Sequence, residues 1–134
     1  MSRPVILCVD DEPLILEALK TELRSRFLGR FSYETALDGL EALALIEELV
    51  AEGVSIVLVV SDWMMPGIKG DEFLSRVHVR WPSIRTILIT GHADREALER
   101  LLSSDVAPHI LPKPWKSQEL LGLVERLCAS PGSP

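Results

Sequence analysis

Residues 54–62 read VSIVLVVSD, an apolar run that only Ser55 interrupts before it ends in a serine and an aspartate. A short run this rich in β-branched residues predicts a strand over 54–60. Because almost every side chain in it is apolar, both faces of the strand are expected to be buried, as in parallel sheets that helices cover on both sides. The polar residues that follow it mark the point where the strand leaves the core.

The segments on either side of this run alternate between strand and helix patterns. Pro13 opens the first helix pattern, at a position where its missing N–H has no partner to lose, and Asp38 is a candidate cap of the second. The predicted strands are 5–9, 31–36, 54–60, 85–90 and 109–111. The predicted helices are a stretch from 13 through 23, then 39–51, 71–81, 94–103 and 117–129. The apolar stripes expected to face the core are Leu14, Ile15, Ala18, Leu19 and Leu23 in the first helix and Leu40, Leu43, Ala44, Ile46, Leu49 and Val50 in the second.

Five strand–helix pairs in strict alternation predict an α/β fold, a doubly wound parallel sheet with helices on both faces. Right-handed crossovers leave few topologies, and a chain of 134 residues favours the flavodoxin-like (βα)5 arrangement with strand order 2-1-3-4-5. We predict one domain over residues 1–129. The tail at 130–134 has linker composition and leaves room for a longer parent protein.

Composition narrows the classes of partner. The net charge of -6 argues against direct nucleic-acid binding through phosphates and against an anionic membrane surface. No apolar run is long enough to span a membrane, and no signal segment opens the chain. Cys8 and Cys128 have no CxxC spacing, so buried reduced thiols and a cytoplasmic location are expected.

Polar residues stand where the predicted strands end. Asp10 and Asp11 follow the first strand, Asp62 follows the third, Thr90 ends the fourth and Lys113 follows the fifth. Ligands of open parallel sheets bind beyond these carboxyl ends, where the strand order reverses. The first and third strands are neighbours in the predicted order, so the three aspartates are expected to converge.

Three crowded carboxylates need a cation. Two like charges ~4 Å apart repel by about 4 kcal/mol at an effective dielectric constant of 20. An all-oxygen ligand set without histidine or thiolate indicates a hard ion that keeps some of its waters, which points to Mg²⁺. A fixed positive charge from Lys113 and a hydroxyl from Thr90 suit a phosphoryl group.

Four motifs occur in order at these strand ends: VDDE at 9–12, SDWMMP at 61–66 with Gly70, TG at 90–91 and KPW at 113–115. Together they resemble the motif set of the response-regulator receiver domains of two-component signalling, over residues 4–129. The motif endings are also similar to receivers fused to HD-GYP cyclic-di-GMP phosphodiesterases or found in hybrid histidine kinases.

The resemblance implies that Asp62 is the phosphoacceptor, which attacks a phosphohistidine of a histidine kinase or phosphotransfer protein. Lys113 would hold a phosphoryl oxygen, and Thr90 would swing to bond the phosphate. The implied protein ligands of Mg²⁺ are Asp11, Asp10 (mainly through water), Asp62 and the backbone carbonyl of Met64. Such a domain is not an enzyme beyond its own phosphorylation and autodephosphorylation.

Two positions depart from the family pattern. Receivers usually carry Tyr or Phe three residues before the lysine, where this chain has Ile110. We therefore expect a weakened response in the surface formed by 94–103, 109–111 and 117–129, which would control an output domain or partner and which in many receivers also forms a homodimer. Met64 and His92 flank the route of water to the phosphate, and the bulk of Met64 predicts slow dephosphorylation.

Two other functions compete with the signalling switch. A magnesium-dependent phosphohydrolase of the haloacid-dehalogenase type would carry an aspartate two residues after the nucleophile, where this chain has Met64, and a cap domain. A binding module that never takes phosphate is favoured by Ile110 and disfavoured by the intact polar set. At the level of single residues, Asp10, Asp11 or Glu12 could merely cap the first helix.

Overall fold

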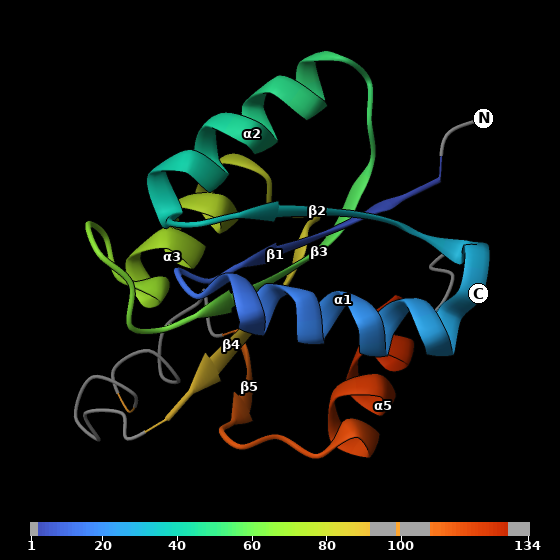
Figure 1. The fold of residues 1–134 in the computed structure, drawn as a ribbon. Helices are drawn as coiled ribbons and strands as arrows, with labels where there is room; N and C mark the ends of the chain where they lie inside the picture. Colours follow the sequence, from blue (N-terminus) through green and yellow to red (C-terminus); the bar gives the residue numbers. More distant parts are fainter. Residues whose placement is uncertain (1–2, 92–98, 100–107, 129–134) are drawn as a thin grey trace.

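A five-stranded parallel sheet organises the structure, a computed structural model that describes residues 3–91, 99 and 108–128 (Figure 1). The elements in chain order are β1 (Val5–Val9), α1 (Pro13–Phe27), the short 3₁₀ helix η1 (Leu28–Arg30), β2 (Ser32–Ala36), α2 (Gly39–Ala51), β3 (Ile56–Asp62), α3 (Gly70–Arg80), β4 (Arg85–Thr90), β5 (His109–Pro112) and α5 (Ser117–Leu127). Apart from residue 99, the helix predicted over 94–103 lies outside the described residues.

The strand order is β2-β1-β3-β4-β5, and every neighbouring pair is parallel, which confirms the predicted topology. The predicted bounds of the third strand were wrong by two residues at each end. Val54 belongs to the turn after α2, because its N–H donates to the carbonyl of Leu49 at 2.9 Å. Ser61 and Asp62 instead continue the ladder, paired with Val9 and with β4.

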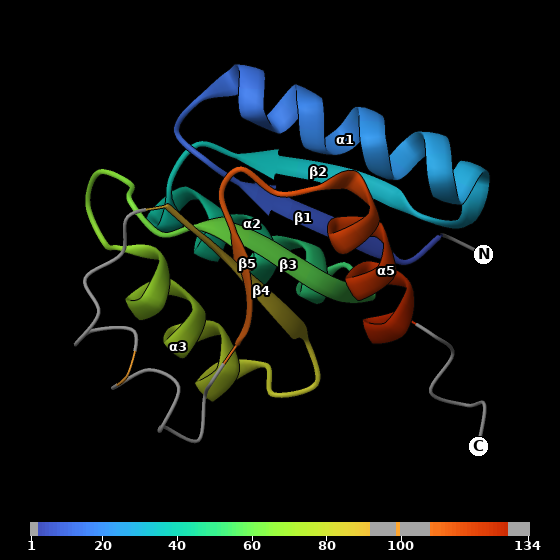
Figure 2. The same ribbon diagram turned by 90° about the horizontal axis from the view of Figure 1, so that it is seen from below.

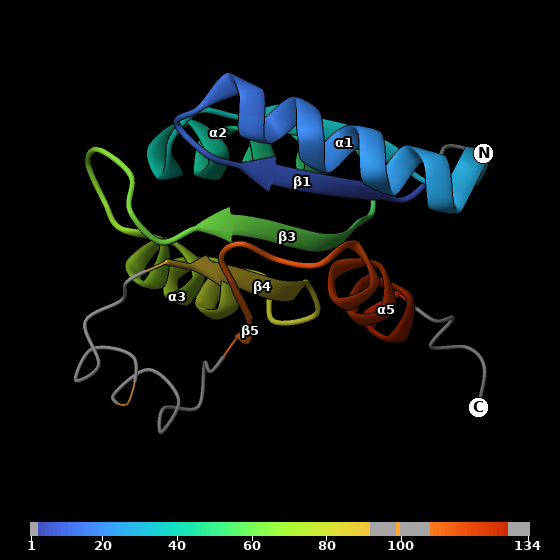
Figure 3. The same cartoon turned by 60° about the horizontal axis from the view of Figure 1, so that its bottom comes forward.

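Helices lie on both faces of the sheet, α2 and α3 on one and α1 and α5 on the other (Figure 2, Figure 3), and each face has an apolar layer. Alternate residues of each strand point to opposite faces, so Leu7 packs with α2 and α3 in one cluster, while Ile6 and Cys8 pack with α1 and α5 in the other. Burial raises the pKa of the Cys8 thiol to about 12, against a small opposing effect of Lys20. The free thiol is therefore part of the core, as the sequence predicts.

The helices bury narrower stripes than the sequence predicts. Leu14 and Leu40 are 83% and 57% exposed, and Ala18, Ala44 and Val50 are exposed as well. Leu14 and Leu40 lie in the first turns of α1 and α2, at the rim of the sheet, where a helix has fewer neighbours. The residues that α1 buries are Leu16, Leu19, Leu23 and Phe27.

The predicted helix starts of α1 and α2 are confirmed. Pro13 is the first residue of α1, and the Asp38 side chain accepts a hydrogen bond from the Glu41 N–H at 2.8 Å. The bounds of α3 and α5 differ from the prediction by one or two residues, which is within the fraying of helix ends. Among the helices described, none combines the length and apolar character needed to cross a membrane.

Candidate functional site

The carboxyl ends of β1, β3, β4 and β5 meet at one edge of the sheet. Asp62 is the last residue of β3 and pairs with Ile89 of β4, while Asp10 follows β1 directly. Thr90 ends β4, and its carbonyl accepts a hydrogen bond from the Lys113 N–H at 2.6 Å. The parallel register therefore brings four of the predicted site residues to the same place.

Three carboxylates converge there, as the sequence predicts. Asp10, Asp11 and Asp62 each offer an oxygen, and these oxygens lie within 4.8 Å of one another. Asp10 and Asp62 are 1% and 6% exposed, whereas Asp11 faces the solvent. The group could hold a metal ion, with two buried anchors and one ligand open to water.

Asp10 provides the sharpest test of that fit. Its Oδ1 accepts a hydrogen bond from the Glu12 N–H at 2.9 Å, while its Oδ2 is buried and has no hydrogen-bond partner among the residues that the structure describes. Burial raises the pKa of Asp10 to about 6; the negative charges of Asp62 and Asp11 add to this, and the Glu12 N–H and Lys113 oppose it. A buried, unpaired carboxylate oxygen is costly unless a cation binds it, so the residues fit a hard divalent ion.

Capping of α1 does not account for these acids. Glu12 is the N-cap residue of α1, but its side chain makes no capping hydrogen bond. The first turn of the helix contains no acidic residue. Among the described residues, the Asp10 side chain accepts a hydrogen bond from the N–H of Glu12, ahead of the helix.

Lys113 pairs with the predicted acceptor. Its Nζ lies 3.0 Å from Asp62 Oδ1, with the lysine side chain 33% exposed and the aspartate side chain 8% exposed. Partial burial disfavours the charged form of Lys113, but the hydrogen bond to Asp62 and the charges of Asp62, Asp10 and Glu12 outweigh it and raise the pKa. The ammonium therefore stays charged beside the carboxylate.

The remaining predicted residues surround this pair. Thr90 is 4% exposed at the end of β4. Met64 is 63% exposed in the loop after β3, whereas Met65 is buried. The residues on either side of Met64, Trp63 and Met65, are both buried in the core cluster on the α2 and α3 face. The implied role of the Met64 carbonyl stays a prediction.

Gly70 has a closer connection to the acceptor than its sequence position indicates. Its N–H donates to the Trp63 carbonyl at 2.8 Å. A Cβ at this position would collide with the backbone carbonyl of Asp62 and come within 2.9 Å of the Trp63 Cα. Only glycine lets α3 begin directly against the end of β3.

Glu22 is a residue that sequence reasoning missed. Its carboxylate accepts hydrogen bonds from the Trp115 Nε1 at 3.0 Å and from the Ser117 Oγ at 2.5 Å, on either side of the start of α5. A polar residue in an amphipathic helix gives no signal for a contact 93 residues away along the chain.

Ile110, at the position where the family usually carries an aromatic residue, is partly buried. It pairs with Leu88 of β4 and packs against the core cluster on the α2 and α3 face. Its neighbour His109 is largely exposed; partial desolvation of its ring, together with the charges of Arg126 and Arg85, lowers its pKa. Neither Ile110 nor His109 places a Tyr or Phe ring at the position where the family usually has one.

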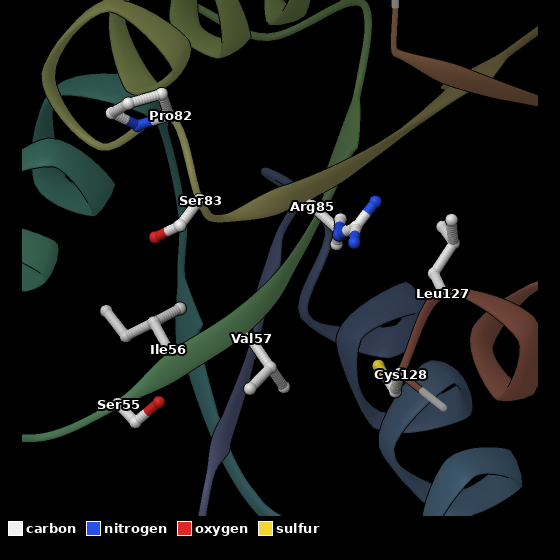
Figure 4. Close-up of a pocket in the computed structure, with 8 residues that line it drawn as sticks. All are labelled: Ser55, Ile56, Val57, Pro82, Ser83, Arg85, Leu127 and Cys128. Carbon is white, nitrogen blue, oxygen red and sulfur yellow. The ribbon is translucent and has the colours of Figure 1, made fainter. Parts of the chain in front are cut away.

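The opposite edge of the sheet has a different character. A pocket of 440 Å³ lies there, between the starts of β3 and β4 and the end of α5 (Figure 4). The residues that line it are Ser55, Ile56, Val57, Pro82, Ser83, Arg85, Leu127 and Cys128. Exposed arginines occupy this edge in the described part of the chain: Arg26, Arg80, Arg85 and Arg126. The pocket contains no carboxylate and is separate from the Asp62 site.

Comparison with known proteins agrees with this geometry. The family model of the response regulator receiver domain matches residues 6–125. The chain is 32% identical to the hydrogenase transcriptional regulatory protein HoxA of Cupriavidus necator, over 97% of this chain and 25% of that protein. It is 32% identical to the sensor kinase CckA of Brucella abortus, over 91% of this chain and 12% of that protein. It therefore spans a quarter or less of these two relatives.

A solved structure gives the same result at the level of the fold. The signal receiver domain of an HD domain-containing protein from Pseudomonas fluorescens Pf-5 superposes with a TM-score of 0.79 and 31% identity, and the match covers 94% of each chain. Sheet order, site and family model together define an α/β receiver domain. The chain belongs to the response regulator receiver domain family of two-component signalling.

Proposed function

We propose that this chain is a cytoplasmic phosphoacceptor domain, with Asp62 as the residue that takes a phosphoryl group from a histidine kinase or phosphotransfer protein. The observation that carries the proposal is the convergence of three carboxylates with a lysine ammonium 3.0 Å from Asp62 Oδ1. Every residue of that set ends a strand or follows one within two residues. The free cysteines fit a reducing compartment.

In the proposed transfer, a carboxylate oxygen of Asp62 forms a bond to phosphorus while the N–P bond of the phosphohistidine breaks. The electron pair returns to the imidazole nitrogen, which takes a proton from solvent. The product is an acyl phosphate on Asp62. Phosphoryl transfer depends on positioning and charge neutralisation more than on covalent chemistry, and this edge of the sheet supplies both.

The other residues divide these tasks. Lys113 neutralises the charge of the transferred group, and the buried Thr90 hydroxyl donates to one of its oxygens. Asp10, Asp11, Asp62 and the carbonyl of Met64 would hold Mg²⁺. When bound, Mg²⁺ screens the acceptor carboxylate and neutralises charge on the phosphoryl oxygens. The domain turns over no separate substrate and loses its phosphate by hydrolysis.

We further propose that the phosphorylated state is read by a fused output domain or a partner at the surface of β5, α5 and the residues predicted as helix at 94–103. The relatives named a transcriptional regulatory protein and a sensor kinase support output by fusion. The HD domain-containing neighbour supports the same arrangement.

A magnesium-dependent titration with beryllofluoride, a phosphoryl analogue, tests the acceptor. Trp63 is buried directly after Asp62, so its fluorescence should change saturably in the wild type and not in Asp62→Asn. Asp71→Asn, in the first turn of α3, serves as the matched control and should respond as the wild type does. A wild type that binds neither Mg²⁺ nor beryllofluoride would instead indicate a phosphorylation-independent interaction module.

A further inference from the structure

The segment that follows Lys113 is anchored to a helix. One oxygen of the Glu22 carboxylate, in α1, accepts from the Trp115 Nε1 at 3.0 Å, and the other accepts from the Ser117 Oγ at 2.5 Å. Glu22 thus commits both oxygens to residues two and four positions beyond Lys113. This is a charge-assisted pair of contacts, which is stronger than contacts between neutral groups.

The start of the same segment is fixed to the sheet. The Lys113 N–H donates to the Thr90 carbonyl at 2.6 Å, so the backbone is held by β4 at position 113 and by α1 at position 115. A lysine ammonium sits on a flexible four-carbon stem. The position of the Lys113 Nζ, 3.0 Å from Asp62 Oδ1, therefore depends on a fixed backbone around Lys113.

Packing on the side facing α1 is incomplete. An open hollow of 670 Å³ lies between the helix and the segment, and both Glu22 and Lys113 line it. Ile15 and Trp115 pack against the core cluster of α1 and α5 but are only partly buried. Because apolar contact is incomplete here, the two hydrogen bonds to Glu22 add a specific restraint between α1 and the segment.

We propose that Glu22 is a positioning residue for the phosphoacceptor site: through Trp115 and Ser117 it fixes residues 113–117 and so holds the Lys113 ammonium against Asp62. The inference rests on the proposed function. It extends that function to a residue of α1 that lies outside the four motifs and touches neither the phosphoryl group nor the metal.

The test compares binding of beryllofluoride, followed by fluorine NMR in the presence of Mg²⁺, in Glu22→Ala and Trp115→Phe. Each variant should bind about tenfold more weakly than the wild type, which corresponds to about 1.4 kcal/mol. Mg²⁺ affinity without beryllofluoride should stay unchanged, because the carboxylates do not move. A merely structural role would lower both affinities together.

Two controls separate positioning from general damage to the helix pair. Glu125→Gln removes the Arg26–Glu125 ion pair, a 3.0 Å contact at the far end of α1 and α5, and should leave beryllofluoride binding as it is in the wild type. In a Lys113→Ala background, Glu22→Ala should cause no further loss, since coupled residues are not additive.

The outcomes are distinguishable. An equal loss from Glu22→Ala with and without Lys113 overturns the positioning role, as does wild-type binding in both Glu22→Ala and Trp115→Phe. If the wild type itself fails to bind beryllofluoride while it folds normally, the proposed phosphoacceptor function fails instead.

Discussion

At the scale of single residues, the buried carboxylate of Asp10 should lower the stability of the metal-free fold while it provides an oxygen for a metal ion. Its pKa is raised to about 6 mainly by burial, so the folded state holds a proton that the unfolded state releases near pH 4. Without metal, the free energy of unfolding should fall as the pH rises from about 4 to 6, by up to about 3 kcal/mol. Asp10→Asn should remove this fall and be more stable at pH 7 in chelator, measured by urea unfolding. A variant with the slope of the wild type would contradict the assignment.

We expect Met64 to slow the loss of phosphate from Asp62, because its side chain is exposed in the loop that follows Asp62. A bulky apolar group beside the phosphate hinders a water molecule that approaches in line. Met64→Asn should therefore shorten the lifetime of the phosphorylated domain several-fold, measured by phosphate release after phosphorylation with a small acyl phosphate. Met65→Leu, a substitution in the core, is the control and should keep the wild-type lifetime. An unchanged lifetime in Met64→Asn would contradict the prediction.

Whether the sequence could predict a site residue depends on whether that residue is positioned by its own strand or by the packing of distant elements. A polar residue that ends an apolar run marks the end of a strand in the sequence. This is why the sequence could predict Asp10, Asp62, Thr90 and Lys113. Glu22 was not predictable, because its contacts depend on how α1 and α5 pack, and nothing local in the helix records them. The importance of Gly70 also depends on a distant carbonyl, although its place in the motif was visible.

At the scale of elements, the junction of β3 and α3 tolerates no side chain at Gly70. A Cβ there would strike the Asp62 carbonyl, so Gly70→Ala should cost about 1–3 kcal/mol of stability through overpacking. It should also weaken beryllofluoride binding, because the strand end that carries Asp62 must shift.

Gly122 provides the matched substitution. It lies inside α5, and a Cβ there would meet nothing within 4 Å. Gly122→Ala should stabilise the domain by about 0.5–1 kcal/mol, the usual gain from replacing glycine in a helix. Thermal unfolding of both variants checks the pair; destabilisation by both would show that the two sites do not differ as described.

Element type was easier to predict than element bounds or exposed faces. The 54–60 prediction stopped two residues early because Ser61 and Asp62 are polar, yet backbone pairing with Val9 and Ile89 keeps them in the ladder. Likewise Leu14 fits a helical stripe by spacing, but the rim of the sheet offers it no partner. Hydrophobic pattern records side-chain character, and tertiary position decides burial.

At the scale of the whole molecule, we expect Ile110 to weaken the structural response of the β5 and α5 surface to a change at Asp62. It is packed against the core in place of a ring that exchanges between inward and outward positions. Binding of Mg²⁺ and beryllofluoride should alter amide exchange over 94–104, β5 and α5 only weakly in the wild type, and more strongly in Ile110→Tyr. Equal responses in the two proteins would contradict this view, and no response at all in 94–104 would exclude that surface as the output.

The cluster of aspartates at one edge of the sheet has a consequence for how partners arrive. Asp10, Asp11 and Asp62 gather at that edge, while at the other edge Arg85 and Arg126 are exposed and Arg26 is paired with Glu125 at 3.0 Å. We therefore expect a partner with a basic surface to be attracted to the edge that carries the aspartates. Since charges are screened over about 8 Å at physiological ionic strength, added salt slows the encounter while leaving the chemistry of transfer intact.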